Sequence, residues 1–198
     1  MAESEKEKGK KPEESAGLMD KLLDSRTLVI SAQVDSELAS KVVTQLVLLA
    51  HLDAKRRITI LVNCPGGDVF SGFAIYDMIR YVECPVVTVV AGLAASMGSI
   101  IPLAAGKGNR FALPHSKFLI HQPLLLGYQG RATDLEIQAN EILKDRARIV
   151  KLYADVTGKP EDVIAKDIDR DKWMSAEEAL DYGLIDEIVT NASDLPKG

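Results

Sequence analysis

The N-terminal half of the chain alternates short apolar runs with longer stretches whose apolar residues recur at helical spacing. Runs rich in β-branched residues occur at 27–31, 58–62 and 86–90, and they predict three buried strands. The segments that begin at Asp35 and Asp68 place apolar residues every three or four positions, which is typical of amphipathic helices. This order of strands and helices predicts right-handed βαβ crossovers, and hence an α/β protein with a mostly parallel sheet.

Two features fall at the carboxyl edge of this predicted sheet, where ligands bind in such folds. The pair Gly66 and Gly67 follows the second strand, and Ser96 follows the third. The pattern indicates that the third strand breaks at Gly92 and that a helix of very small residues follows. A serine at such a junction lies near free backbone N–H groups, as a nucleophile requires. The alternative is a tight strand–helix joint in which only small side chains fit.

The C-terminal half begins with two predicted short strands, 111–113 and 118–121, the second of which ends at His121. A lone histidine at a strand end is commonly a structural residue. His121 is, however, the histidine that this topology places at the same edge as Ser96, so it is a candidate base. A final strand is predicted over 184–189.

A long amphipathic helix is predicted over 133–156, with a capping box formed by Thr133 and Glu136 at its start. Apolar residues repeat along it every seven positions, at Leu135, Ile142, Ile149 and Val156. At 1.5 Å per residue this helix is about 36 Å long, which is too long for a small domain to cover. The narrow apolar seam favours packing against a partner helix. The alternative is one more amphipathic helix lying on the sheet.

Composition narrows the classes of function. The 198 residues carry a net charge of −5 without a basic stripe, which disfavours nucleic-acid binding. The apolar runs are too short to span a membrane. The sequence has neither the spacing of metal ligands nor a phosphate-binding loop, so we expect no metal and no cofactor. Two cysteines and no signal sequence favour a cytoplasmic protein. Residues 1–17 predict a disordered charged tail, followed by a single domain over 18–190 and a short tail over 191–198.

Eight short motifs follow one another between residues 18 and 189. They are N-C-P-G-G (63–67), A-I-Y-D (74–77), G-L-A-A-S-M-G-S (92–99), R-F-A-L-P (110–114), I-H-Q-P (120–123), G-Y-Q-G-R-A-T-D (127–134), D-I-D-R-D (167–171) and S-A-E-E-A-L-D-Y-G-L-I-D (175–186). Together they resemble the proteolytic subunit family of the Clp protease. The resemblance implies an α/β fold of the Clp protease and crotonase type, a spiral of βαβ units with a projecting handle helix at about 122–157.

The resemblance also implies the chemistry of a serine endopeptidase. It assigns Ser96 as the nucleophile, His121 as the general base and Asp171 as the carboxylate that orients His121. The backbone N–H groups of Gly67 and Met97 would form the oxyanion hole. His121 would take the proton as Ser96 attacks a peptide carbonyl, and would then give it to the leaving amine.

Members of this family assemble as two stacked seven-membered rings that enclose the active sites. The resemblance therefore implies a tetradecamer, with the handle helix at the contact between rings. Asp169 and Arg170 match the pair that links ring contact to alignment of the triad. The implied partners are a AAA+ Clp ATPase that unfolds proteins and the unfolded proteins that are degraded to short peptides, with no nucleic acid and no membrane.

Three departures from the family pattern point to a divergent paralogue that works in mixed rings with a second Clp proteolytic subunit. The N-terminal segment does not match the usual axial loops, and Leu124-Leu125-Leu126 replaces a shorter glycine-rich stretch. Pro102, which should kink the helix after Ser96, accompanies one extra residue there. Two alternatives to an active endopeptidase remain. One is a subunit that is inactive alone and supports an active paralogue, and the other is an acyl-CoA enzyme of the crotonase class.

Overall fold

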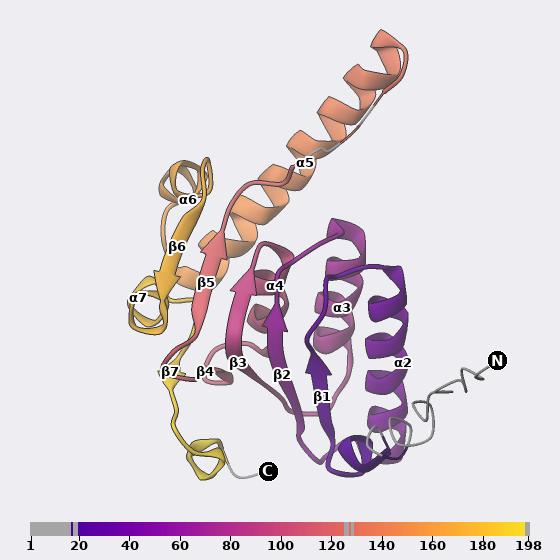
Figure 1. Ribbon diagram of the computed structural model, residues 1–198, viewed down its shortest axis with the longest axis vertical. Helices are drawn as coiled ribbons and strands as arrows, with labels where there is room; N and C mark the ends of the chain where they lie inside the picture. Colours follow the sequence, from indigo (N-terminus) through magenta and orange to yellow (C-terminus); the bar gives the residue numbers. More distant parts are fainter. Residues whose placement is uncertain (1–16, 18–19, 125–126, 128, 197–198) are drawn as a thin grey trace, which may run out of the picture.

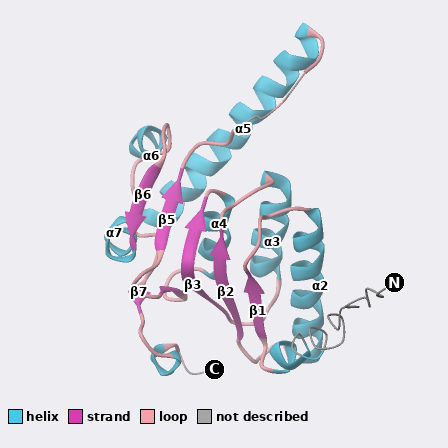
Figure 2. Ribbon diagram, viewed as in Figure 1, coloured by secondary structure: helices cyan, strands magenta, loops and turns pink. Residues whose placement is uncertain are grey.

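The computed structural model describes residues 17, 20–124, 127 and 129–196. The fold is α/β, with helices packed against a β-sheet (Figures 1 and 2). Apart from Gly17, the predicted N-terminal tail lies outside the described residues, as do Leu125 and Leu126. The strands are β1 (Thr27–Ile30), β2 (Ile58–Cys64), β3 (Val86–Ala95), β4 (Arg110–Ala112), β5 (Lys117–Ile120), β6 (Lys172–Ser175) and β7 (Glu187–Ile188). The helices are α2 (Ser36–Leu52), α3 (Val69–Tyr81), α4 (Met97–Ile100), α5 (Ala132–Thr157), α6 (Glu161–Asp167) and α7 (Ala176–Tyr182), with 3₁₀ turns η1 (Ile101–Ala105) and η2 (Ala192–Asp194).

The sheet is mostly parallel, as the alternation of strands and helices predicts. The strand order is β1-β2-β3-β4-β7, and every pair along this path is parallel. The main hydrophobic core lies between the sheet and the helices, where alternate residues of β2 are fully buried. A smaller apolar cluster formed by Val87, Val89, Phe111 and Val189 is separate from this core. Asp35 and Asp68 cap α2 and α3 by accepting backbone N–H bonds.

The prediction that the third strand breaks at Gly92 is wrong. β3 continues to Ala95 because it changes neighbours at this point: Thr88–Val90 pair with β4, whereas Leu93–Ala95 pair with β5. Gly92 has a φ of 116°, and it provides the bend between the two pairings without ending the strand. The helix after Ser96 is accordingly short, and it becomes a 3₁₀ turn where Pro102 removes a backbone donor.

Helix α5 is the projecting helix that the sequence predicts, and Figure 1 shows it extending well beyond the rest of the described chain. Its buried side chains, those of Ile149, Val150 and Tyr153, all lie in its second half. The predicted capping box is wrong, because the helix begins at Ala132 after Arg131 and no side chain caps it. Thr133 is therefore already inside the first turn, where it cannot act as the cap.

The C-terminal segment forms a shorter strand than predicted. Only Glu187–Ile188 form strand β7 and pair with β4. Just before β7, Asp186 donates its backbone N–H to the carbonyl of Arg110, and both of its carboxylate oxygens accept from the buried Arg110 guanidinium. Burial raises the pKa of Asp186, but Arg110 lowers it by more, and the net pKa lies below its ordinary value. This ion pair fixes the end of the chain against β4.

Candidate active site

Ser96 is the single residue between β3 and α4, and its backbone is strained. It has a φ of 54° and a ψ of −126°, a conformation that costs free energy for a residue with a side chain. Two backbone hydrogen bonds hold it: its N–H donates to the carbonyl of Leu119 in β5 at 2.9 Å, and its carbonyl accepts from the N–H of Ser99 at 2.9 Å. A sharp, strained strand-to-helix turn of this kind exposes a serine hydroxyl in known hydrolases.

The glycine pair lies directly against this serine. A Cβ added to Gly66 would lie 2.6 Å from the Cβ of Ser96 and 3.1 Å from the nitrogen of Met97, so no side chain fits there. Gly67 is bridged to Val34, where any side chain would meet backbone. Among the described residues, the N–H groups of Gly67 and Met97 donate no hydrogen bond. These are the two backbone donors that the family resemblance assigns to an oxyanion hole.

His121 and Asp171 face one another across a pair of strands. β5 and β6 are antiparallel with Ile120 opposite Lys172, so the next residue of β5 lies opposite the residue that precedes β6. The Nδ1 atom of His121 lies 3.5 Å from Oδ1 of Asp171, which is longer than a usual hydrogen bond. The His121 side chain is 16% exposed and that of Asp171 is 62% exposed.

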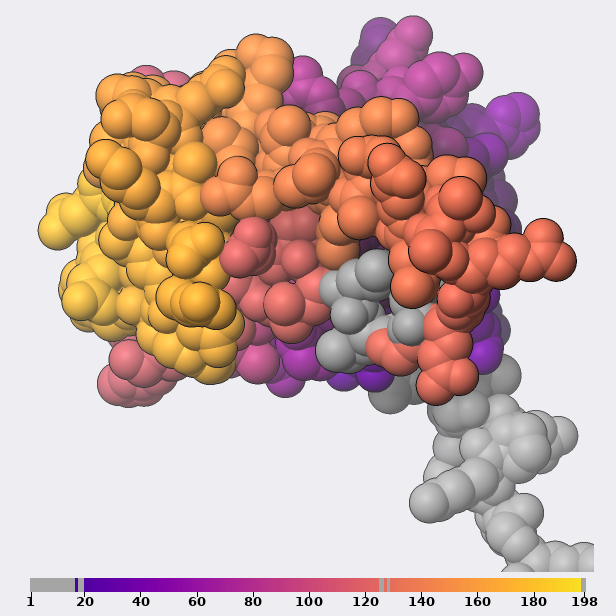
Figure 3. Space-filling model, turned by 90° about the horizontal axis from the view of Figure 1, so that it is seen from above, coloured from indigo at the N-terminus to yellow at the C-terminus, as the bar shows by residue number. Residues whose placement is uncertain are grey.

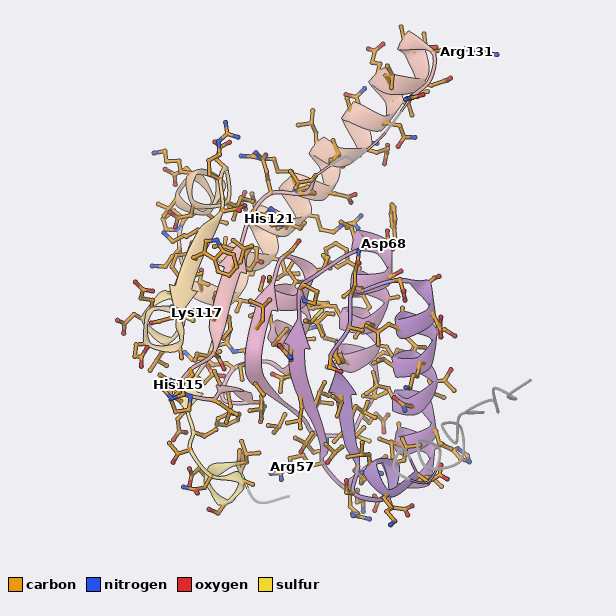
Figure 4. All side chains as sticks on the ribbon, in the orientation of Figure 1. Arg57, Asp68, His115, Lys117, His121 and Arg131 are labelled. Carbon is orange, nitrogen blue, oxygen red and sulfur yellow. The ribbon has the colours of Figure 1, made fainter. Side chains whose placement is uncertain are left out.

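A different pairing of β5, the one with β3, brings the histidine toward the serine. Ala95 pairs with Leu119 in the parallel β3–β5 ladder, so Ser96 and His121 lie just beyond the ends of adjacent strands. Figure 4 shows His121 at the edge of the sheet from which α5 projects, with His115 toward the opposite end. Within the described part of the chain, however, the Ser96 hydroxyl forms no hydrogen bond, either with His121 or with another group.

Two residues to which the sequence assigns no role, Gln122 and Arg146, hold this region together. The Gln122 backbone N–H donates to the carbonyl of Ile168 at 2.6 Å, and its side-chain amide donates to the carbonyl of Asp169 at 3.0 Å. Arg146 of α5 donates to the Gln122 side-chain oxygen and to the carbonyl of Ala165, both at 3.0 Å. The I-H-Q-P motif could have pointed to Gln122. Nothing in the sequence marks Arg146, because one of its acceptors is a backbone carbonyl.

The connector that carries Asp171 is also fixed at its other end. The Asp167 carboxylate accepts from the Lys172 ammonium at 2.9 Å and from the Tyr182 hydroxyl at 2.7 Å. Burial raises the pKa of Asp167, but these two donors lower it by more. Burial and the nearby carboxylate raise the pKa of Tyr182. Between these anchors, Asp169 and Arg170 lie on the surface with only a loose contact of 3.7 Å, and the Arg170 side chain is 91% exposed.

Two cavities border the site. One of about 390 Å³ is lined by His121, Gln122, Leu124 and residues 169–171 of the connector. The other, of about 220 Å³, runs from Gly67 past Leu124 to α5. Figure 3, which looks onto this edge, shows residues of the β5 region in a hollow between α5 and the C-terminal segments.

Other kinds of site find little support in the described residues. No group of three or more His, Cys, Asp and Glu side chains is arranged there to hold a metal ion. Cys64 and Cys84 are both buried, and burial raises the pKa of the Cys64 thiol. None of the helices in this part of the chain combines the length and hydropathy needed to cross a lipid bilayer.

Comparison with known proteins identifies the family. The family model for Clp protease matches residues 10–192. The chain is 46% identical over 195 residues to ATP-dependent Clp protease proteolytic subunit 2 of Treponema denticola, covering 98% of this chain and 97% of that protein. It is 50% identical over 175 residues to proteolytic subunit 1 of Protochlamydia amoebophila (88% and 85% covered), and 48% identical over 176 residues to proteolytic subunit 1 of Chlamydia muridarum (88% and 92% covered). A match over nearly the whole chain, on a mostly parallel α/β sheet with a projecting helix, shows that this chain belongs to the Clp protease family.

Proposed function

We propose that this chain is the serine endopeptidase subunit of a Clp protease, with Ser96, His121 and Asp171 as its catalytic triad. The observation that carries the proposal is the cross-strand approach of His121 Nδ1 to Asp171 Oδ1 at 3.5 Å, next to strand β3, which Ser96 directly follows. A carboxylate on Nδ1 leaves the other ring nitrogen, Nε2, to accept the serine proton. Ser96 lies in a strained turn at the same edge of the sheet as His121, where its hydroxyl can act as the nucleophile.

Catalysis follows from these positions. The Ser96 hydroxyl attacks the peptide carbonyl while His121 accepts its proton, and the Asp171 carboxylate stabilises the imidazolium that forms. The oxyanion then accepts hydrogen bonds from the N–H groups of Gly67 and Met97, which have no other acceptor among the described residues. His121 returns the proton to the leaving amine, and water hydrolyses the acyl-enzyme in the reverse sequence.

Before catalysis, Ser96 and His121 must move close enough for the serine hydroxyl to hydrogen-bond to the histidine. Catalytic hydrogen bonds are often long in unliganded enzymes and shorten when substrate binds. We infer that ring assembly controls this movement, because Arg146 of α5 is hydrogen-bonded to Gln122, the residue that follows His121, and to the carbonyl of Ala165. The projecting half of α5 carries exposed Ile137 and Leu143, which packing between two rings would cover.

The assembly and its partners belong to the same proposal. The relatives named above are called ATP-dependent proteolytic subunits, and their names number them as 1 or 2. We infer two stacked seven-membered rings, some of them mixed with a second Clp proteolytic subunit. We also infer a AAA+ ATPase that delivers unfolded proteins, and a cytoplasmic location. Asp169 and Arg170 lie on the surface of the connector, where a neighbouring ring can contact them.

Peptide hydrolysis by the assembled particle tests this function. Ser96→Ala should abolish cleavage of a short fluorogenic peptide, whereas Ser40→Ala, which changes an exposed serine on α2, should leave it unchanged. Particle mass measured on the same samples shows that both variants assemble. Wild-type rates in the Ser96→Ala particle would rule out this residue as the nucleophile.

Because the described residues show no hydrogen bond between Ser96 and His121, a second function is also supported: a subunit that is inactive alone and becomes part of an active particle only with a paralogue. Under this alternative the purified chain assembles but hydrolyses no peptide, and activity appears only in a mixed particle. Ser96→Ala in that mixed particle separates the two. It lowers the rate if this chain contributes active sites, and leaves the rate unchanged if the chain is only structural.

A further inference from the structure

A buried chain of hydroxyl groups connects the Ser96 backbone to helix α5. Ser99 Oγ lies 2.7 Å from the Ser96 carbonyl oxygen, to which it donates, and 2.7 Å from the hydroxyl of Tyr153. Ser99 is 2% exposed and Tyr153 is 1% exposed, so neither group can bond to bulk water instead. Burial raises the pKa of the Tyr153 hydroxyl, which is therefore protonated and able to donate.

The direction of these hydrogen bonds follows from the number of protons. A serine hydroxyl has one proton, and that of Ser99 is directed to the Ser96 carbonyl. Tyr153 must therefore be the donor in its contact with Ser99 Oγ. The chain runs from Tyr153 to Ser99 to the carbonyl of Ser96, and each proton in it has an acceptor.

These hydrogen bonds restrain the strained backbone of Ser96, which has a ψ of −126°. The Ser96 carbonyl accepts two bonds from Ser99, one from the backbone N–H at 2.9 Å and one from the hydroxyl at 2.7 Å. Together they restrain the ψ of Ser96, while the bond from its N–H to Leu119 restrains the other side. A residue in a sparsely populated conformation keeps it only when its surroundings hold it there.

We propose that Ser99 is a positioning residue for the nucleophile: its buried hydroxyl holds the Ser96 backbone in its reactive conformation, and Tyr153 of α5 donates to that hydroxyl and so keeps both buried groups paired. The inference rests on the proposed role of Ser96 and adds two residues to which that proposal assigns no part. It also gives α5 a second connection to the active site, separate from the one that Arg146 makes on the His121 side.

The proton count predicts different effects for the two residues. Ser99→Ala removes a donor to Ser96 and leaves the buried Tyr153 hydroxyl without an acceptor, so both activity and stability fall. Tyr153→Phe leaves the Ser99-to-Ser96 bond in place, so activity changes little. In the double variant the unpaired tyrosine hydroxyl is gone and stability recovers, but the bond to Ser96 is still missing.

The experiment measures kcat and KM for a fluorogenic peptide, together with the thermal unfolding midpoint, in the particle that hydrolyses the peptide. For Ser99→Ala we expect kcat to fall about 3- to 10-fold with KM unchanged, the effect of one hydrogen bond that positions the reacting group. Tyr153→Phe should lower kcat by less than about 3-fold. The double variant should keep the low kcat of Ser99→Ala while its unfolding midpoint rises above that of Ser99→Ala.

Thr88→Val is the matched control. Thr88 is fully buried in β3 and donates at 3.0 Å to the carbonyl of Pro102 in η1, so the variant also removes a buried hydroxyl-to-carbonyl bond in this strand–helix unit. It does not contact Ser96. We expect a lower unfolding midpoint and an unchanged kcat.

Recovery of kcat along with stability in the double variant would overturn the inference, because activity would then follow stability alone. Loss of kcat in Thr88→Val as large as in Ser99→Ala would overturn it for the same reason. Ser96→Ala, measured in parallel, separates this inference from the proposed function. If Ser96→Ala is inactive and Ser99→Ala has wild-type kcat, only the positioning role fails. If Ser96→Ala is fully active, the nucleophile assignment fails as well.

Discussion

Replacement of Asp171 by asparagine should lower kcat by an amount that the geometry sets. At 3.5 Å, opposite unit charges attract by about 5 kcal/mol with an effective dielectric constant of about 20, and by about 1 kcal/mol in bulk water. The Asp171 side chain is 62% exposed, so the pair lies between these limits. A loss of roughly 2–3 kcal/mol corresponds to a fall in kcat of about 30- to 150-fold.

The effect should fall on kcat and leave KM nearly unchanged. The imidazolium exists only after His121 has taken the serine proton, so the carboxylate stabilises the transition state more than bound substrate. Steady-state hydrolysis of a fluorogenic peptide measures both constants. Because the pair is partly exposed, added salt should reduce the wild-type kcat more than that of Asp171→Asn.

Asp162→Asn serves as the control, since it removes an exposed carboxylate from α6 that makes no ion pair within the described residues. Its kcat should equal that of the wild type. The reasoning is refuted if Asp171→Asn retains kcat within about 3-fold of the wild type. A change confined to KM would refute it equally, because the carboxylate would then affect binding and not the imidazolium.

Three further predictions concern the frame around the site. Asp186→Asn should destabilise the fold by about 3 kcal/mol, because it removes the anionic partner of buried Arg110. The pKa of Asp186 is depressed in the folded state, so the pair's contribution is complete above about pH 4 and is lost as the pH falls through the folded pKa; urea unfolding of both proteins should therefore converge at low pH. Gly66→Ala should lower peptidase activity at least about 100-fold by displacing the nucleophile. Gly106→Ala, at a positive φ with open space around it, should keep its activity. Leu143→Glu on α5 should leave circular dichroism unchanged and shift the particle mass toward single rings, and an unshifted mass would contradict the assigned role of α5.

The elements that the sequence predicts correctly are those whose residues have strong local preferences. Strands β1 and β2 form and pair in parallel, as their composition indicates, but only alternate residues in them are buried, and Val29 of β1 is exposed. The small residues that end β3 carry no such preference, and pairing with β5 decides that they form a strand. The pattern predicts no strand at β6, because this strand has four residues and only Met174 is buried.

The missed strand matters for the site. The position of Asp171 opposite His121 follows from the antiparallel β5–β6 register, which the pattern of apolar residues does not reveal. The motifs assign both residues only by resemblance to a family. The strained φ of Ser96 and its bonds to Ser99 arise from tertiary contacts with β5 and α5, which no local preference encodes.

The most direct test of the triad is to map where an active-site phosphonate reacts. Labelling of the assembled particle, followed by peptide mass spectrometry, should find one adduct per active subunit on Ser96. The rate of labelling should fall by at least about 100-fold in His121→Ala, which lacks the base. An adduct on another residue, or wild-type labelling of Ser96 in His121→Ala, would contradict the assignment of these side chains as a nucleophile and its base.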